Sequence, residues 1–250
     1  MLCLAFGFRS RGGQTIITLS PFHINTCWYG ILGLIGWAYL AATIVYLIFR
    51  SNRTAILGCV ALMLCFFAAD KHGFFDHFWL NEYVGFGDTL GSQAAITVAG
   101  VLLASILVTP DMASIRARTL FTLLFIAGFA AAAVLLNGLY GISKNDATPS
   151  WCLWSCAVTA ALWLLFYFLA DVRRITPVSK PFAIAGQNVL LAYLISEGLE
   201  SFLDLLHLSD WYDHLSGSNL TCACARSAGC AGAILAITAW LNRFGFRLKL

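Results

Sequence analysis

Two long runs without a charged residue, 119–136 and 152–170, limit what this chain can fold into more than any other feature. About 20 consecutive apolar residues cross the hydrocarbon core of a bilayer as an α-helix. Between the two runs lies a short polar segment that includes Lys144, Asn145 and Thr148. We therefore expect two membrane-spanning helices joined by a polar mouth, with Thr148 as the N-cap of the second helix.

The composition agrees with a membrane protein. Hydrophobic residues make up 60% of the 250 residues and charged residues 11%, whereas charged residues are roughly a quarter of a soluble domain. The net charge of +3 gives no indication of a nucleic-acid partner. The nine cysteines do not suggest a disulfide framework, because several of them fall inside apolar runs, where cysteine acts as a small hydrophobe.

Apolar runs of spanning length predict an all-α fold, a polytopic transmembrane bundle of about seven spans in one domain over residues 1–250. Residues 1–29 are interpreted as the remnant of a span, of which only the last two turns are present, followed by an outer segment. Residues 30–250 would form the seven-span bundle. The expected spans are 30–49, 54–69, 89–108, 119–140, 151–170, 183–206 and 222–241.

The basic residues predict the orientation of these spans. With seven spans, ten lysines and arginines fall on one side of the membrane and five on the other. The richer side is expected to be cytoplasmic by the positive-inside rule, which makes this an integral multi-pass protein with a cytoplasmic C-terminus. The ten are Arg50, Arg53, Arg116, Arg118, Arg173, Arg174, Lys180, Arg243, Arg247 and Lys249.

Four segments carry a resemblance to a known family. Lys144 and Asn145 are followed by a Thr-Pro-Ser-Trp helix start at 148–151 and by Asp171 and Val172 at the end of that helix. The chain in this way resembles the heparan-α-glucosaminide N-acetyltransferase family of transmembrane acyltransferases. Three further segments lie in the family's order, namely the glycine-rich helix start at 30–40, the Leu-Gly-Ser run at 90–96 and the Pro-Phe…Gly-Gln-Asn helix at 181–193.

The resemblance implies acetyl transfer from cytoplasmic acetyl-CoA to an acceptor on the other side of the membrane. Family members place the histidine that accepts the acetyl group in an N-terminal half without counterpart here, and none of the five histidines matches its motif. We therefore expect an acyltransferase-like chain that is inactive alone and needs a missing N-terminal half or other membrane chains. The alternative is a non-catalytic structural membrane subunit of a larger complex, with membrane lipids as its other partners.

Six residues are candidates for binding. Lys144 and Asn145, a point charge and an amide at the outer mouth, are suited to orienting a polar substrate, or they are ordinary loop residues. Asn188, beside Gly186 and Gln187, would hold a substrate or cofactor group, or else bridge neighbouring helices. The basic residues that would meet the phosphates of coenzyme A, or serve only topology, are Arg173, Arg174 and Lys180.

The strongest periodic signal lies in the range 183–206. Acidic and other polar residues recur there at spacings of four, three, four and three, which places them on one helix face. Glu197 lies well inside this range, and an acidic residue in a span must face the bundle interior or a water-filled cavity. Glu197 is thus the candidate general acid or base, unless it only joins helices by hydrogen bonds. The face consists of Tyr193, Glu197, Glu200, Asp204 and His207.

No metal site is expected from the sequence. His72 and His77, with Asp70 and Asp76, lie together in an outer loop, but their spacing matches no standard metal site. A small-molecule transporter is a third class that the acidic face of 183–206 allows. It ranks last, because the chain shows neither an inverted repeat nor a pair of broken helices.

Overall fold

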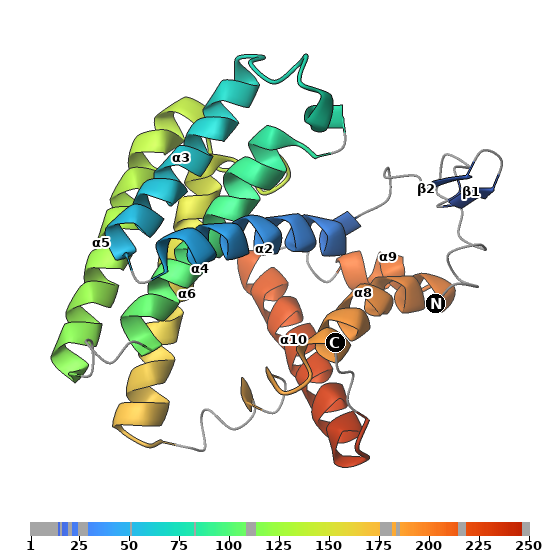
Figure 1. Ribbon diagram of the computed structural model, residues 1–250. Coiled ribbons are helices and arrows are strands. Elements are labelled where there is room, and N and C mark those ends of the chain that lie inside the picture. The colour runs from blue at the N-terminus through green and yellow to red at the C-terminus, as the bar shows by residue number, and fades with distance from the viewer. Residues whose placement is uncertain are drawn as a thin grey trace. The chain divides into compact units, whose positions relative to one another are not determined.

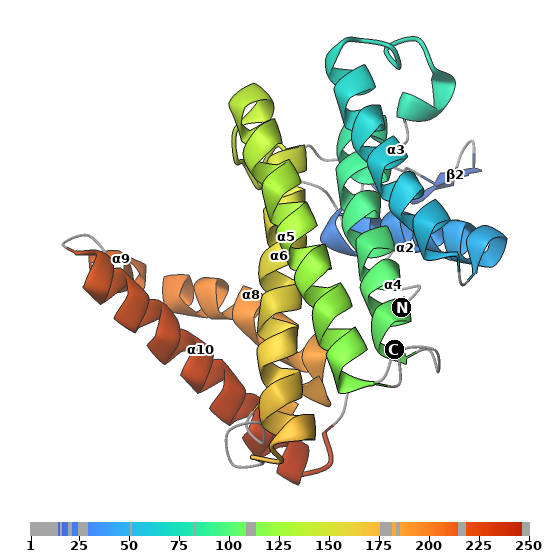
Figure 2. The same cartoon turned by 90° about the vertical axis from the view of Figure 1, so that its left-hand side faces the viewer.

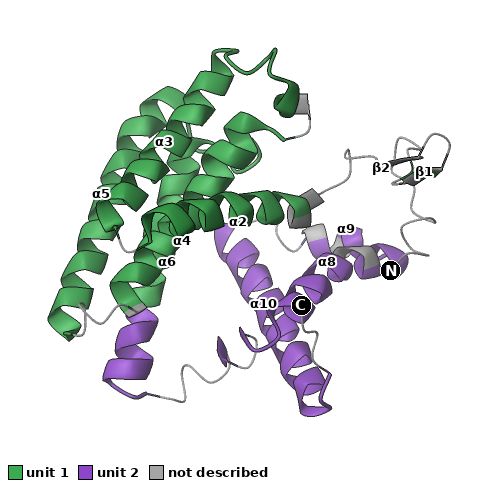
Figure 3. Cartoon of the chain, viewed as in Figure 1, with its two compact units in different colours: residues 1–164 green, residues 165–250 purple. Residues whose placement is uncertain are grey.

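The chain folds into helices that form two compact units, residues 1–164 and 165–250, in the computed structural model (Figures 1 and 3). The two units are described separately below. The all-α helical fold predicted from the sequence is confirmed, apart from one small hairpin. The structure describes residues 15, 17–19, 22–24, 30–50, 52–82, 84–108, 114–175, 182–183, 186–214 and 219–246.

The first unit is built on a bundle of apolar helices. Figures 1 and 2 both show α2 lying at a steep angle to the other helices of this bundle, which run up and down beside one another. Short connections make these neighbours antiparallel, as expected for successive spans. The elements are α2 (Gly30–Phe49), α3 (Arg53–Lys71), the π-helix η2 (Phe86–Gln93) continued by α4 (Ala94–Val108), α5 (Ile115–Tyr140) and α6 (Pro149–Phe166).

Small and branched apolar side chains form the core of this unit. Alanines from α2, α4, α5 and α6 are almost fully buried, which lets the helix backbones approach closely, as membrane helices do. Phe125 and Phe129 of α5 stack with their ring centroids 4.0 Å apart. The outer faces of α2, α3 and α5 instead expose leucine, isoleucine and phenylalanine side chains, which suits contact with lipid.

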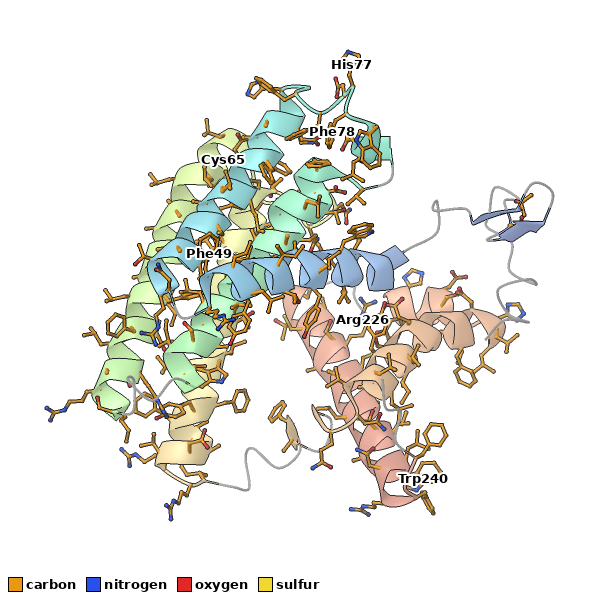
Figure 4. The ribbon with its side chains drawn as sticks, in the orientation of Figure 1. Phe49, Cys65, His77, Phe78, Arg226 and Trp240 are labelled. Carbon is orange, nitrogen blue, oxygen red and sulfur yellow. The ribbon has the colours of Figure 1, made fainter. Side chains whose placement is uncertain are left out.

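An aromatic loop follows α3 and includes the 3-10 helix η1 (Trp79–Glu82). The Phe75 ring stacks on the Phe86 ring at 4.7 Å, and Phe78 meets Phe86 edge-on at 5.2 Å. His77 points away from the bundle at the edge of this loop (Figure 4). Trp79 is exposed in η1, beyond the end of α3, and tryptophan side chains are enriched at the membrane–water interface.

The second unit contains α8 (Val189–Leu205), α9 (Ser209–His214) and α10 (Leu220–Arg243), and it begins with the end of α6 and the π-helix η4 (Tyr167–Val172). Arg226 of α10 donates to the Tyr212 carbonyl at 3.1 Å, and its guanidinium carbon lies 4.5 Å from the centroid of the Tyr212 ring (Figure 4). This pair joins α10 to α9.

Five of the described helical stretches, not seven, are long and apolar enough to cross a membrane. Their boundaries lie within four residues of five expected spans. Helix α2 covers the whole of the expected span 30–49, and the apolar stretch of its described residues is Gly33–Phe49. Helix α8 begins only at Val189 and rises roughly 26 Å, less than the hydrocarbon core of about 30 Å. The five are Arg53–Lys71, Phe86–Leu107, Ile115–Tyr140, Pro149–Val172 and Leu220–Arg243.

The N-terminal region contains a small hairpin in its described part. Strand β1 (Ile17–Leu19) pairs antiparallel with β2 (Phe22–Ile24), with Thr18 opposite His23. The apolar residues 1–8, interpreted as the remnant of a span, lie outside the described residues. That interpretation and the expected single domain over 1–250 stay predictions.

Candidate functional site

The polar mouth predicted between two spans is a compact turn that is closed by its own hydrogen bonds. Thr148 stands before the first turn of α6, and its hydroxyl donates to the Gly141 carbonyl at 3.0 Å. The same hydroxyl accepts from the Ser143 backbone N–H at 3.0 Å. Ser143 in turn donates to the Asp146 carboxylate at 2.6 Å. Thr148 therefore takes the N-cap position, as expected, but its side chain closes the loop instead of capping the helix.

This turn stores backbone strain. Ala147 has φ of +47° and Gly141 has φ of +67°. Only glycine adopts this left-handed region freely, so Ala147 costs roughly 1–3 kcal/mol that the surrounding contacts must offset. Ala147 and Thr148 are both buried. The polar turn is therefore held in this conformation by two buried residues, Ala147 and Thr148.

Lys144 and Asn145 lie at the tip of this turn, and both side chains are exposed. The sequence predicted that they lie at an outer polar segment between two spans, and in the structure they lie in the turn between the last residue of α5 and the first residue of α6. Neither residue lines the groove described below. Their role in substrate binding stays a prediction.

A buried polar layer lies beneath the turn, between α6 and the π-helix η2. The Cys152 thiol lies 3.5 Å from the Ser92 carbonyl oxygen, and Ser92, Thr89 and Ser150 are almost fully buried. The Ser92 hydroxyl has no hydrogen-bond partner among the described residues. A π-helix within a longer helix often marks a functional position, because it re-aims side chains. Sequence reasoning did not single out this layer.

Asn188 is a helix bridge in the second unit. Its side chain is 2% exposed. Its amide nitrogen donates to the Asn242 side-chain oxygen and to the Phe246 carbonyl, each at 2.9 Å. Both amide N–H groups are therefore used to join the start of α8 to the end of α10. This geometry favours the bridging alternative over the binding of a substrate or cofactor.

The other candidates of the second unit do not gather around Asn188. Glu197 lies on α8 about 13 Å further along the helix axis, and its side chain is exposed. Arg173 and Arg174 follow the π-helix η4 and are also exposed, with φ of +56° at Arg174. Lys180 lies outside the described residues. None of the described contacts brings these residues together in the second unit.

The described part of the first unit contains an apolar groove of about 460 Å³. Helices α3, α4 and α5 line it, and Leu153 of α6 contributes at its base. Leu57, Phe121 and Leu124 line the groove and are also exposed, so the groove opens toward the surroundings of the bundle. Its volume lies within the range of about 300–1,000 Å³ that is usual for small-molecule sites.

One end of the groove is polar. Arg53 and Thr54 are the two polar residues of its described lining, and both belong to the first turn of α3. The Arg53 guanidinium donates from Nε to the Ser105 hydroxyl at 3.3 Å and from Nη2 to the Ser105 carbonyl at 2.9 Å. These bonds hold the cation at the place where α3 begins and α4 ends.

The groove runs along α3 for a length close to the thickness of one bilayer leaflet. From Arg53 to Leu64 its lining climbs α3 by roughly 16 Å, at about 1.5 Å per residue. This is about half of the roughly 30 Å hydrocarbon core of a bilayer. Gly128 and Ala132 of α5 line the same depth with small side chains and leave the space open. A groove of this length with a cation at one end fits a single-tailed portion of an amphiphile.

Sequence reasoning missed this groove and used Arg53 only as a marker of topology. A signal was present in part, because Arg53 directly follows Asn52, whose side chain caps α3 by accepting from the Ala55 N–H at 3.1 Å. The groove itself needs residues from four helices, which no local pattern brings together. Among the described residues, no group of three histidine, cysteine or acidic side chains is placed to hold a metal ion.

Comparison with known proteins finds no matching family model, no matching curated protein and no matching solved structure. The resemblance to the transmembrane acetyltransferase family, and the acetyl-CoA that it implies, therefore stay predictions.

Proposed function

We propose that this protein is an integral membrane protein that binds one hydrocarbon chain of an amphiphile in the groove of its first unit. The single observation that supports the proposal is the groove itself, which is apolar along the depth of one leaflet and has Arg53 at one end. Methylene groups in the groove would meet leucine, phenylalanine and alanine side chains. The role suits a lipid-binding membrane subunit, the non-catalytic alternative inferred from the sequence.

A second candidate is the acyl transfer that the family resemblance implies. The observation that favours it is Arg53 in the groove lining, because this residue belongs to a segment that the basic residues predict to face the cytoplasm, the side from which a coenzyme A thioester would arrive. In this case the hydrocarbon chain in the groove would be the acyl group of the donor. An acetyl group has two carbons and would leave most of the groove empty, so a long acyl chain fits better.

A photocrosslinking experiment tests the binding of a chain. The purified protein in nanodiscs is mixed with a phosphatidylcholine that carries a diazirine in one tail, and crosslinked peptides are identified by mass spectrometry. We expect adducts on the groove-facing residues of α3 and α5, between Thr54 and Leu64 and between Phe121 and Ala132.

Two glycines of α5 provide a matched pair of variants. Gly128 lines the groove, Gly138 is exposed elsewhere on the same helix, and a Cβ at either position would meet no atom within 4 Å. Gly128→Leu fills the groove and should reduce the adducts severalfold, whereas Gly138→Leu should leave them unchanged. Equal labelling of both variants, or adducts spread evenly around α5, would refute the proposal.

The two candidates make different predictions for a thioester. If the groove binds an acyl donor, palmitoyl-CoA should protect the groove from crosslinking, and the protein should release coenzyme A when an amine acceptor is present. A lipid-binding subunit should show the crosslinks without release of coenzyme A. A free-thiol assay on the same nanodisc sample distinguishes the two results.

A further inference from the structure

The aromatic loop lies at a membrane surface because of its place in the chain. It connects α3, which ends at Lys71, to the π-helix η2, which begins at Phe86. Both neighbours are long and apolar enough to cross a membrane, and only residues 72–85 join them. A connection this short keeps the loop at the end of the bundle where the two helices leave the bilayer. No described residue of the loop lines the groove, so this surface is separate from the proposed function.

Ring contacts hold the loop beside the last turns of α3. The rings of Phe75 and Phe86 lie with their centroids 6.1 and 6.3 Å from that of Phe66 on α3. Phe66 precedes Lys71, the last residue of α3, by five positions, which is roughly 7.5 Å along the axis at about 1.5 Å per residue. The loop therefore folds back alongside the bundle and does not extend straight into water.

The backbone of the loop forms hydrogen bonds with the end of α3 and within the loop itself. Gly73 has φ of +75°, which lets the chain turn back directly after α3. The Phe74 N–H donates to the Ala69 carbonyl at 3.1 Å. The Asn81 side-chain oxygen accepts from the Phe86 N–H at 3.0 Å. Polar backbone groups that are bonded in this way cost less to bring into poorly hydrated surroundings.

The exposed side chains of the loop are of two kinds. Phe74 is 78% exposed and Trp79 is 66% exposed, although both are large and apolar. Asp76 and His77 are exposed as well, and His77 points away from the bundle (Figure 4). Exposed apolar side chains that lie close together mark an interaction surface. Beside the end of a membrane helix, the partner that fits aromatic rings with polar neighbours is the lipid interface, where tryptophan is enriched.

From these observations we infer that the aromatic loop anchors the first unit in the lipid interface of the leaflet where α3 ends. Phe74 and Trp79 lie among the lipid headgroups and the upper acyl chains, while His77 faces water. The contacts of Phe75 and Phe86 with Phe66 set the level at which the loop meets the lipid.

Photocrosslinking from the loop tests the anchor. The photoreactive residue p-benzoylphenylalanine replaces Phe74, Trp79 or His77, one at a time, in the otherwise unchanged full chain. Each variant is irradiated in nanodiscs of phosphatidylcholine, and lipid adducts are measured by mass spectrometry. Positions 74 and 79 should give severalfold more lipid adducts than position 77. An aromatic side chain replaces an exposed aromatic one at 74 and 79, so the fold should be preserved.

A second pair of variants tests what holds the loop in place. With the photoreactive residue at position 79, Phe66→Ala should lower the yield of lipid adducts severalfold, because the ring that the loop packs against is lost. The control is Leu62→Ala, also on α3, where the side chain is 56% exposed. This change should leave the yield unaltered.

The results that would overturn the inference are specific to the loop. Equal lipid adducts at 74, 77 and 79, or none at 74 and 79, would show that the two aromatic side chains are not inserted in lipid. Crosslinks between two copies of the chain in place of lipid adducts would assign the surface to a second copy. Either result leaves the binding of a hydrocarbon chain in the groove untouched.

Discussion

A methyl group added at Gly91 should destabilise the first unit, because α3 and the π-helix η2 meet there backbone to backbone. A Cβ at Gly91 would lie 3.0 Å from the Phe86 carbonyl oxygen, 3.1 Å from the Met63 carbonyl oxygen and 3.1 Å from the Phe67 nitrogen. All three atoms belong to the backbone of packed helices. None can move aside as the end of a side chain would, so the helices themselves must separate.

Two opposing contributions set the size of the effect. Overpacking of a tight contact costs about 1–3 kcal/mol, while replacing glycine by alanine in a helix gains up to about 1 kcal/mol. Gly91→Ala should therefore lower the free energy of unfolding by about 1–2 kcal/mol. For a chain of this size, that corresponds to a fall in midpoint temperature of roughly 2–8 °C.

Thermal unfolding in detergent micelles, followed by circular dichroism, measures this shift. The matched control is Gly100→Ala on α4, where a Cβ would meet no atom within 4 Å and only the gain in helix propensity remains. Gly100→Ala should unfold at the wild-type temperature or slightly above it. If Gly91→Ala were as stable as the control, the close approach of α3 and η2 would be wrong.

Three further predictions concern the loop, the helix bridge and the topology. Thr148→Val removes the hydroxyl that closes the polar turn, and limited proteolysis should then cleave the turn several times faster. Asn188→Leu and Asn242→Leu should each lower the free energy of unfolding. In a double-mutant cycle, the two losses should differ from additivity by about 0.5–3 kcal/mol, as measured by denaturant unfolding. In a cysteine-free background, thiol reagents should label Lys144→Cys and Arg116→Cys from opposite faces of the membrane.

The positions of five spans could be predicted from the sequence because burial in lipid leaves a direct trace. A run such as 152–170 without charge has no economical alternative to a membrane helix, and Pro149 marks where that helix begins. The turn before it was predictable as a polar mouth. Its internal hydrogen bonds were not predictable, because the Thr148 hydroxyl can bond either to backbone N–H groups of the helix that follows it or to backbone groups of the loop before it.

The predicted count of seven spans was wrong, and residues 183–206 show one reason: their composition suggested a spanning helix, but the helix that forms there is shorter than the predicted span. Residues 183–206 are apolar enough to suggest a span, but helix α8 starts only at Val189, after Asn188 has turned its amide toward α10. Four of the five polar residues of this spacing lie on α8, as predicted, and Glu197 is exposed there, but His207 lies beyond the last residue of α8, Leu205, with φ of +54°. A one-dimensional pattern shows which residues share a face but not which neighbour covers that face.

The depth of the groove leads to a final prediction about tail length. Ala132 lines the groove at its deep end on α5, and Ala131 is exposed next to it on the same helix. Ala132→Phe should block the deep end, so adducts from tails of 16 or 18 carbons should fall severalfold while those from tails of about 10 carbons persist, because the entrance at Arg53 stays open. Ala131→Phe should change neither. Equal loss of short and long tails would place Ala132 at the entrance and reverse the direction assigned to the bound lipid.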